Sequence, residues 1–170
     1  MTKYWVGVAS TEHVQKGVAD GIAQVCHGKQ GPLKRMQPED WIVYYSPVEI
    51  FGGKQPCRKF TAIGQVKEGQ PYQFEMSPSF ALASVEALPK NLTFIESENG
   101  GIKCAKSDTP WRRDVQFMQA HDAAIEPLIE QLHFIENKVY WGFKFRFGLF
   151  EINHHDFLLI AQNMGVSIEK

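Results

Sequence analysis

Residues 141–152 read Trp-Gly-Phe-Lys-Phe-Arg-Phe-Gly-Leu-Phe-Glu-Ile, and between Phe143 and Phe147 an aromatic residue alternates with a basic one. Side chains of a β-strand alternate between its two faces, so a strand here would place Phe143, Phe145 and Phe147 on one face and the basic residues on the other. Such a strand suits contact with nucleic acid, because phosphates attract cations and unpaired bases stack on aromatic rings. The alternative is a half-buried strand with its phenylalanines in the core and its basic residues in water.

The composition is that of a globular domain. The chain has 170 residues, of which 44% are apolar and 22% charged, so it is long enough to bury a core of its own. The formal net charge is −1, and any contact with nucleic acid must therefore come from a local basic patch. We expect a single domain over residues 1–170.

The cysteines and the first residues bear on the cellular compartment. Cys26, Cys57 and Cys104 lack the paired spacing of a disulfide framework or a zinc ribbon. The chain begins directly with a strand-like segment, shows no signal segment, and has no apolar run as long as a membrane span. We therefore expect a cytoplasmic protein that does not associate with membranes.

Strand and helix signals follow one another irregularly. Strands are expected at 4–9, 41–46, 58–67, 71–76, 111–118 and in the aromatic stretch; helices at 12–19, 125–134 and after Asn153; a loop at 22–33; and an inserted hairpin or loop at about 77–109. This order lacks the regular alternation of a parallel doubly wound sheet. It favours antiparallel strands that curl into a small barrel with helices at its edge.

No catalytic set emerges from the sequence. It contains no glycine-rich phosphate-binding motif, no paired-histidine zinc motif and no nucleophile elbow. The pairs Cys26-His27 and His154-His155 are adjacent in sequence, and such neighbours rarely point at a common atom. We expect no catalytic residue, no metal and no cofactor.

A loop at 24–32 carries features of a ligand-binding segment. Its glycines let backbone amides approach a ligand closely. His27 offers a donor, an acceptor and a ring that can stack, and Lys29, Lys34 and Arg35 follow at once. The alternative is a flexible connection with incidental lysines.

Two further segments combine an aromatic ring with a polar or basic group. Tyr44-Tyr45-Ser46 ends a strand, where one ring is expected to face inward and the other outward; Trp111 precedes Arg112 at a strand entrance or closes the core. A pocket for one flipped base needs this mixture. Extruding a base costs a few kcal/mol, and stacking returns roughly 1–3 kcal/mol per base.

Segments that are similar to the EVE domain occur in order along nearly the whole chain. They are Tyr4–Ser10, Gly21–Pro32, Leu33–Pro47, Phe60–Val66, Trp111–Val115, Pro127–Ile135, Lys138–Phe143 and Gly148–Ile152. The EVE domain belongs to the PUA-like superfamily, beside YTH domains. The resemblance implies an α+β fold, with a curved antiparallel β-barrel and peripheral helices. It also implies a pocket for a modified base, in a reader and not in an enzyme.

The resemblance also implies a site. Its base-binding residues would be Ser10, Val25, Cys26, His27, Gly28, Tyr45 and Ser46. From the residues themselves we expect Trp111 as a further wall of the pocket, and Lys29, Lys34, Arg35, Arg112 and Arg146 as phosphate-binding residues. A cage tryptophan of the YTH relatives falls near Val25, which is not aromatic. A methyladenine reader of the YTH type is therefore disfavoured, and stacking would come from Trp111, Tyr45 and His27.

We expect a monomer that reads a modified base in DNA, such as 5-methyl- or 5-hydroxymethylcytosine. One alternative is an RNA-binding module that recognises modified tRNA or rRNA bases or assists an RNA-modifying enzyme, which would use the 2′-hydroxyl. A second alternative is a protein that binds free nucleosides or nucleotides, which would be stabilised by nucleosides without any oligonucleotide.

Overall fold

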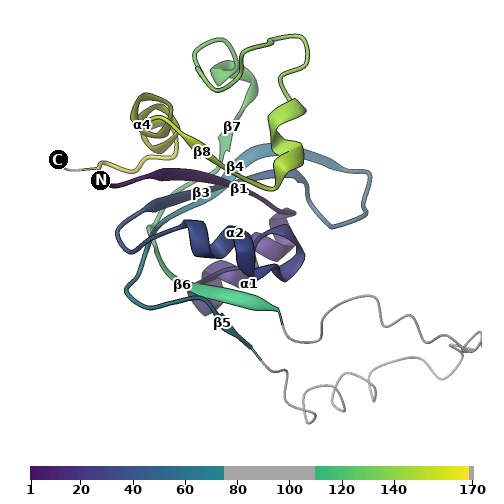
Figure 1. Cartoon of the computed structure of the whole chain (residues 1–170). Coiled ribbons are helices and arrows are strands. Elements are labelled where there is room, and N and C mark those ends of the chain that lie inside the picture. Colours follow the sequence, from purple (N-terminus) through teal and green to yellow (C-terminus); the bar gives the residue numbers. More distant parts are fainter. Residues whose placement is uncertain (75–109, 169–170) are drawn as a thin grey trace, which may run out of the picture.

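The computed structural model describes residues 1–74 and 110–168, so the expected insertion at 77–109 lies outside the described residues. Within them, eight strands form one curved sheet in the order β2-β6-β4-β3-β1-β8, with β5 paired to β6 and β7 to β4 (Figure 1). The strands are β1 (Tyr4–Val8), β2 (Ile22–Ala23), β3 (Trp41–Val48), β4 (Pro56–Val66), β5 (Tyr72–Gln73), β6 (Trp111–Phe117), β7 (Ala123–Ala124) and β8 (Leu149–Ile152).

Three α-helices and three short 3₁₀ helices accompany the sheet in the described part of the chain. They are α1 (Thr11–Asp20), α2 (Gln30–Arg35), α4 (His154–Asn163), η1 (Cys26–Gly28), η2 (Glu126–Leu128) and η3 (Phe143–Phe147). The expected α+β class is confirmed. None of these helices has the length and apolar character needed to cross a membrane.

The sheet is mixed, not purely antiparallel. β1 and β3 run parallel, from Tyr4 beside Trp41 to Val8 beside Tyr45, whereas the other strand pairs of the described chain are antiparallel. The segment between them holds α1 and α2, and parallel neighbours require such a long crossover. As a result, the carboxyl ends of β1 and β3 meet at one edge of the sheet.

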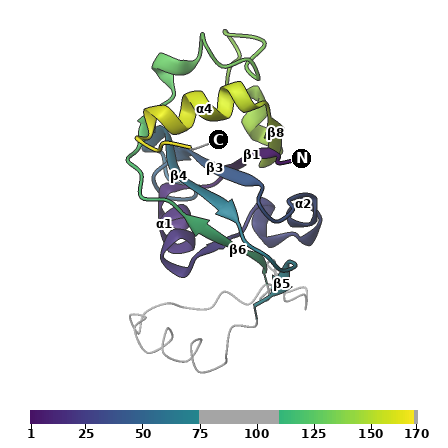
Figure 2. The ribbon, with the colours of Figure 1, turned by 90° about the vertical axis from the view of Figure 1, so that its left-hand side faces the viewer.

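Both faces of the sheet are covered. On one face α4 contributes Phe157 and Ile160 to a core with Val43 of β3; on the other, Leu33 of α2 packs in a core with Ile42. Figure 2 shows α4 on one side of the strands and α1 and α2 on the opposite side. This double coverage explains why residues 42–46 of β3 are all buried, whichever face their side chains point to.

The helix ends follow the sequence signals. α1 ends at Gly21, whose φ of 66° is left-handed and whose amide donates to the carbonyls of Gly17 and Val18. α4 begins after Asn153, whose side chain accepts from the Asp156 amide at 2.8 Å. The expected loop at 22–33 is wrong in part, because it contains β2, η1 and most of α2.

The stretch between Phe143 and Phe147 is a 3₁₀ helix, and the expectation of a strand is wrong. Phe145 is 8% exposed, whereas Phe143 and Phe147 are each 59% exposed. The edge strand β8 begins only at Leu149 and pairs with β1, so the preceding residues make local hydrogen bonds, such as Phe143 N to Tyr140 O at 3.0 Å. A 3₁₀ turn has three residues, which separates Phe145 from its two aromatic neighbours.

The expected helix at 125–134 is also shorter than the apolar pattern indicated. Only Glu126–Leu128 is helical, followed by turns. The buried Asp156 carboxylate accepts from the backbone amides of His133 at 2.9 Å and Phe134 at 2.8 Å. These two donors are therefore used by α4 and not by a continuing helix.

Candidate nucleic-acid interface

Three consecutive residues, Cys26, His27 and Gly28, have positive φ angles of 49°, 58° and 77°. We call residues 26–28 the left-handed turn. Positive φ is uncommon for residues other than glycine, so two such residues in a row indicate local strain. The Gly28 amide donates to Val25 O at 3.0 Å, and a Cβ on Gly28 would lie 2.8 Å from the Pro110 Cβ. The hydrogen bond and the close approach of Pro110 therefore hold the turn.

The left-handed turn presents His27 to solvent and buries part of Cys26. The His27 ring meets the exposed Phe51 ring edge-on, with centroids 5.9 Å apart. Cys26 Sγ lies 3.7 Å from the Phe147 carbonyl oxygen. Burial raises the pKa of the Cys26 thiol, against the opposing charges of Arg35 and Lys29, so the thiol is protonated at neutral pH and is a poor nucleophile.

The edge where β1 and β3 end brings together three of the predicted base-binding residues. Ser10 follows β1, is 6% exposed, and its hydroxyl does not cap α1. Tyr45 stacks on Phe145 with centroids 4.0 Å apart, and the buried Ser46 hydroxyl lies 2.8 Å from that of Thr61. In this structure neither Tyr45 nor Ser46 opens to solvent.

The two tyrosines of β3 do not divide into one inward and one outward ring. Tyr44 is 3% and Tyr45 2% exposed, and they pack in opposite cores. The Tyr44 hydroxyl donates to Gln24 O at 3.2 Å. The expectation fails because helices cover both faces of the sheet.

Trp111 and Arg112 lie at the start of β6. Trp111 is half-buried against the core beneath α1 and α2, which is the core-closing role considered from the sequence. The Arg112 guanidinium lies over the Phe74 ring, 4.1 Å from its centroid. Val25 is buried in the hydrophobic core against which Trp111 packs.

A groove beside the left-handed turn gathers cations from distant parts of the chain. Its volume is about 710 Å³, and its lining includes Lys3, Lys34, Arg35 and Lys144 together with Trp5 and Phe147. We call it the basic groove. The single acidic residue of its lining is Glu151.

The contacts of these cations shape the groove. Arg35 Nη2 donates to Leu149 O at 3.1 Å, and its guanidinium lies 5.4 Å from the Trp5 ring centroid. Lys3 pairs with Glu151 at 3.0 Å, an exposed ion pair that is weak in water. Arg35 is thus held in place by the protein, and within residues 1–74 and 110–168 its other nitrogens make no hydrogen bond and could donate to a phosphate.

One carboxylate, just before β3, and one guanidinium, in β6, are buried in the interior. Asp40 accepts from Trp5 Nε1 at 3.0 Å and from Lys3 N at 2.9 Å. Arg113 is 2% exposed; burial lowers its pKa, and the Asp40 charge opposes that shift. Among the described residues, Arg113 Nε and Nη2 have no hydrogen-bond partner.

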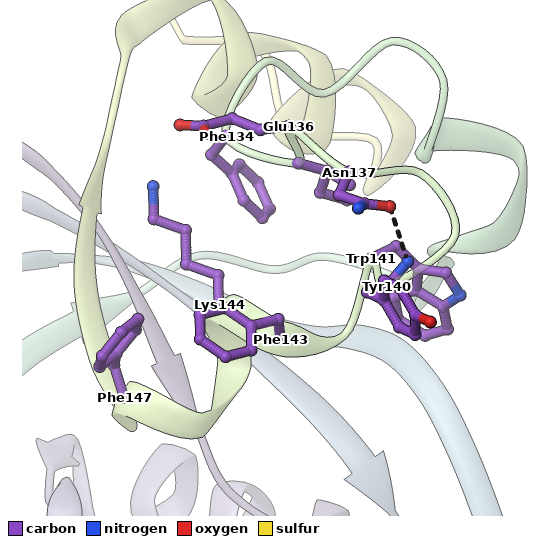
Figure 3. A pocket seen from close by; sticks show the side chains of 9 residues that line it. Phe134, Glu136, Asn137, Tyr140, Trp141, Phe143, Lys144 and Phe147 are labelled. Carbon is purple, nitrogen blue, oxygen red and sulfur yellow. Dashed lines mark hydrogen bonds between the residues drawn. The ribbon is translucent and has the colours of Figure 1, made fainter.

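A second cavity adjoins the basic groove. Its volume is about 420 Å³, and its lining consists of Phe134, Ile135, Glu136, Asn137, Tyr140, Trp141, Phe143, Lys144 and Phe147 (Figure 3). We call it the aromatic hollow. Lys144 and Phe147 line both the groove and the hollow.

The predicted phosphate-binding residues divide between the basic groove and other surfaces. Lys34 and Arg35 line the groove. Lys29 is exposed just before α2, Arg146 lies over the Phe143 ring at 5.6 Å, and Arg112 lies at Phe74. Lys3 and Lys144 also line the groove but were not among the predicted phosphate-binding residues; Lys144 was expected on the cationic face of a strand.

Among the described residues, His133, His155 and Asp156 could hold a metal ion, since one ligand atom of each lies within 4.8 Å of the others. The two imidazoles stack with centroids 4.2 Å apart, and His155 Nδ1 lies 3.0 Å from Asp156 Oδ1. The carboxylate already binds two backbone amides, which gives it a structural role without a metal. The sequence offered only the neighbouring pair His154-His155.

Comparison with known proteins agrees with this architecture. The model of the EVE domain family matches residues 3–163. The UPF0310 protein msl3206 of Mesorhizobium japonicum is 44% identical over 97% of this chain and 93% of its own length. The UPF0310 protein YdcG of Bacillus subtilis is 38% identical over 98% of this chain and 95% of its own length.

Solved structures share the fold at low identity. A hypothetical protein from Leishmania major has a TM-score of 0.53 at 10% identity, over 95% of this chain and 94% of that one. Protein Atu2648 of Agrobacterium tumefaciens has a TM-score of 0.52 at 10% identity, over 99% and 97%. These structural similarities support the fold alone. The family model and the relatives, in contrast, match nearly the full chain, and this chain therefore belongs to the EVE domain family.

Proposed function

We propose that this protein binds nucleic acid and reads one modified base, with modified cytosine in DNA as the first candidate. The observation that carries the proposal is the basic groove, where Lys3, Lys34, Arg35 and Lys144 converge although the chain as a whole has a net charge of −1. Membership of the EVE domain family supports nucleic acid as the partner.

The basic groove suits a phosphate backbone. Its cations come from the residue before β1, from the end of α2 and from η3, so they are brought together by the fold and not by a run of sequence. Phosphates displace counterions at such a surface, which makes binding depend on salt. Arg35 is oriented by its bond to the Leu149 carbonyl, which lowers the entropy cost of contacting a phosphate.

The left-handed turn is the proposed contact with the modified base. Strained backbone is found at ligand-binding sites when surrounding packing enforces it, and the packing of Gly28 on Pro110 does so here. His27 supplies an exposed ring and a polar edge, and Ser10 supplies a hydroxyl that α1 does not use. A base that reached Tyr45 would first have to displace the Phe145 ring.

Binding without catalysis is part of the proposal. Cys26 is the nucleophilic side chain of the left-handed turn, and burial raises its pKa. A protonated thiol beside a carbonyl oxygen is suited to packing and to weak hydrogen bonding, not to attack on a substrate.

Matched fluorescent oligonucleotides test the proposal. DNA and RNA strands of one sequence would carry cytosine, 5-methylcytosine, 5-hydroxymethylcytosine, adenine or N6-methyladenine at one position, at fixed salt. We expect a several-fold preference for one modified base, and loss of that preference in His27→Ala but not in the matched control His121→Ala.

Equal affinity of the wild-type protein for modified and plain strands would contradict base reading. A preference retained by His27→Ala would overturn the assigned contact but not the reader itself. Tighter binding to RNA than to DNA of the same sequence would move the substrate to RNA, through the 2′-hydroxyl. Stabilisation by free nucleosides alone would instead indicate a small-molecule site.

A further inference from the structure

The aromatic hollow exposes more aromatic surface than its place in the fold requires. Tyr140 is 72% exposed, and Phe143 and Phe147 are each 59% exposed. Contiguous exposed apolar patches rimmed by polar groups mark interaction sites on soluble proteins. Resting on the proposed nucleic-acid function, we propose that the aromatic hollow binds a second, unstacked base of the same strand, next to the base read at the left-handed turn.

The dimensions and chemistry of the hollow fit one base. Its volume of about 420 Å³ lies in the lower part of the range of small-ligand pockets. The Phe143 and Phe147 rings are perpendicular, with centroids 6.0 Å apart, so they offer one ring face and one ring edge to a planar group. Stacking on such rings tolerates any base, because every base has a π face.

Asn137 supplies a polar group at the rim. Its Oδ1 accepts from the backbone amides of Val139 at 3.0 Å and Tyr140 at 3.1 Å, the second of which is drawn in Figure 3. These bonds orient the side-chain amide and use its acceptor, so the NH₂ group is the part left to donate to a base edge.

Because the aromatic hollow adjoins the basic groove, a nucleotide suits the hollow better than an apolar protein segment does. Lys144 lines both cavities, and Figure 3 shows its chain rising between the Phe147 and Phe134 rings. A base in the hollow would place its phosphate beside Lys144, in line with Lys34 and Arg35. An apolar protein segment would desolvate the Lys144 ammonium without pairing it, which carries a cost.

Contacts between the three positions suggest the path of the nucleic-acid strand. Cys26 of the left-handed turn contacts the Phe147 carbonyl, and Phe147 separates the basic groove from the hollow. The turn, the groove and the hollow are thus adjoining positions, and neighbouring nucleotides of one strand can occupy them in sequence.

Two variants and one matched control test the inference. Tyr140→Ala and Phe143→Ala remove rings of the hollow, while Val139→Ala removes a side chain that is 80% exposed beside Tyr140 but does not line the cavity. The ligand is a single-stranded oligonucleotide with the preferred modified base. A second set of strands carries an abasic site at each flanking position in turn.

We expect wild-type protein to lose about tenfold in affinity when one flanking base is missing, because stacking on one ring system is removed. The same loss should follow from Tyr140→Ala or Phe143→Ala on the complete strand, with no further loss on the abasic strand. Val139→Ala should bind like wild type. Preference for the modified base should persist in all three variants.

The possible failures are distinguishable. If wild-type protein shows no preference for any modified base, the proposed function fails. If it reads the base but binds abasic and complete strands equally, and the two ring variants bind as tightly as wild type, the inference is overturned. A sedimentation change of unliganded protein in Phe143→Ala, from dimer to monomer, would overturn it in favour of a second copy of this chain.

Discussion

The edge at the ends of β1 and β3 and the aromatic hollow differ in how they treat aromatic rings. At the edge, the Tyr45 ring is buried beneath the stacked Phe145 ring, and Ser10 and Ser46 are also buried. In the hollow, the rings of Tyr140, Phe143 and Phe147 are exposed to solvent. Both arrangements depend on η3, which sends Phe145 inward to close the edge and Phe143 and Phe147 outward to line the hollow. One short helix therefore sets what is closed and what is open.

Among the substitutions that would alter this difference between the edge and the hollow, Phe145→Ala is expected to have the largest effect on stability. The ring packs on Tyr45 and lies within 5.8 Å of Phe134 and 5.7 Å of Phe150, between centroids. Its removal should lower the free energy of unfolding by about 3–5 kcal/mol. Phe143→Ala, in the same helix, should change it by no more than about 0.5 kcal/mol.

Urea unfolding of the two variants provides the measurement. In a strand the two rings would share a face and the losses would be similar, so equal destabilisation would refute the 3₁₀ geometry of η3.

A smaller loss of stability is expected from Gly28→Ala, which tests how tightly the left-handed turn is packed. The substitution places a Cβ at a φ of 77°, 2.8 Å from the Pro110 Cβ, and should cost about 1–3 kcal/mol. Gly31→Ala is the matched control, because no atom lies within 4 Å of its added Cβ. Thermal unfolding of both variants should separate them; a Gly28→Ala protein as stable as Gly31→Ala would show that the turn is not tightly packed.

The smallest effect concerns the pH dependence of stability near the left-handed turn. Burial lowers the pKa of His13 below 6.5, helped by Lys16, Arg112 and His27 and opposed by a hydrogen bond to the Gln24 backbone. The unfolded chain therefore binds a proton that the folded chain resists, and stability falls as pH decreases through 6.5 toward the lowered value.

His13→Gln should reduce that fall. Urea unfolding between pH 7.5 and pH 5 measures the slope. An identical slope in His13→Gln and wild type would mean that His13 titrates alike in both states.

Much of the fold could be predicted from local signals. The helices expected at 12–19 and after Asn153 are present, and Gly21 ends α1 and Asn153 caps α4 through their own backbone preference or side chain. The parallel pairing of β1 with β3 could not be predicted from alternation, since it depends on a crossover that packs two helices on the sheet.

The candidate site was predictable in composition more than in geometry. The aromatic and basic residues of 143–147 do belong to a candidate interface, but strand periodicity assigned the wrong neighbours to them. Lys3 and Lys144 reach the basic groove only through tertiary packing, for which the sequence carries no spacing rule. Tyr45 was predicted to form a wall of the pocket, but Phe145, a hundred residues away in the chain, stacks on its ring and it is buried.

The salt dependence of oligonucleotide binding would show whether phosphates of the nucleic-acid backbone contact the basic groove. Affinity for a strand with the preferred base would be measured over a series of salt concentrations for wild type, Lys34→Ala and Lys67→Ala; the last removes an exposed lysine outside the basic groove. The account predicts that Lys34→Ala weakens binding to modified and plain strands alike and reduces the slope of log K against log salt by about one. Lys67→Ala should match wild type. Equal slopes for all three proteins would contradict a nucleic-acid backbone in the basic groove.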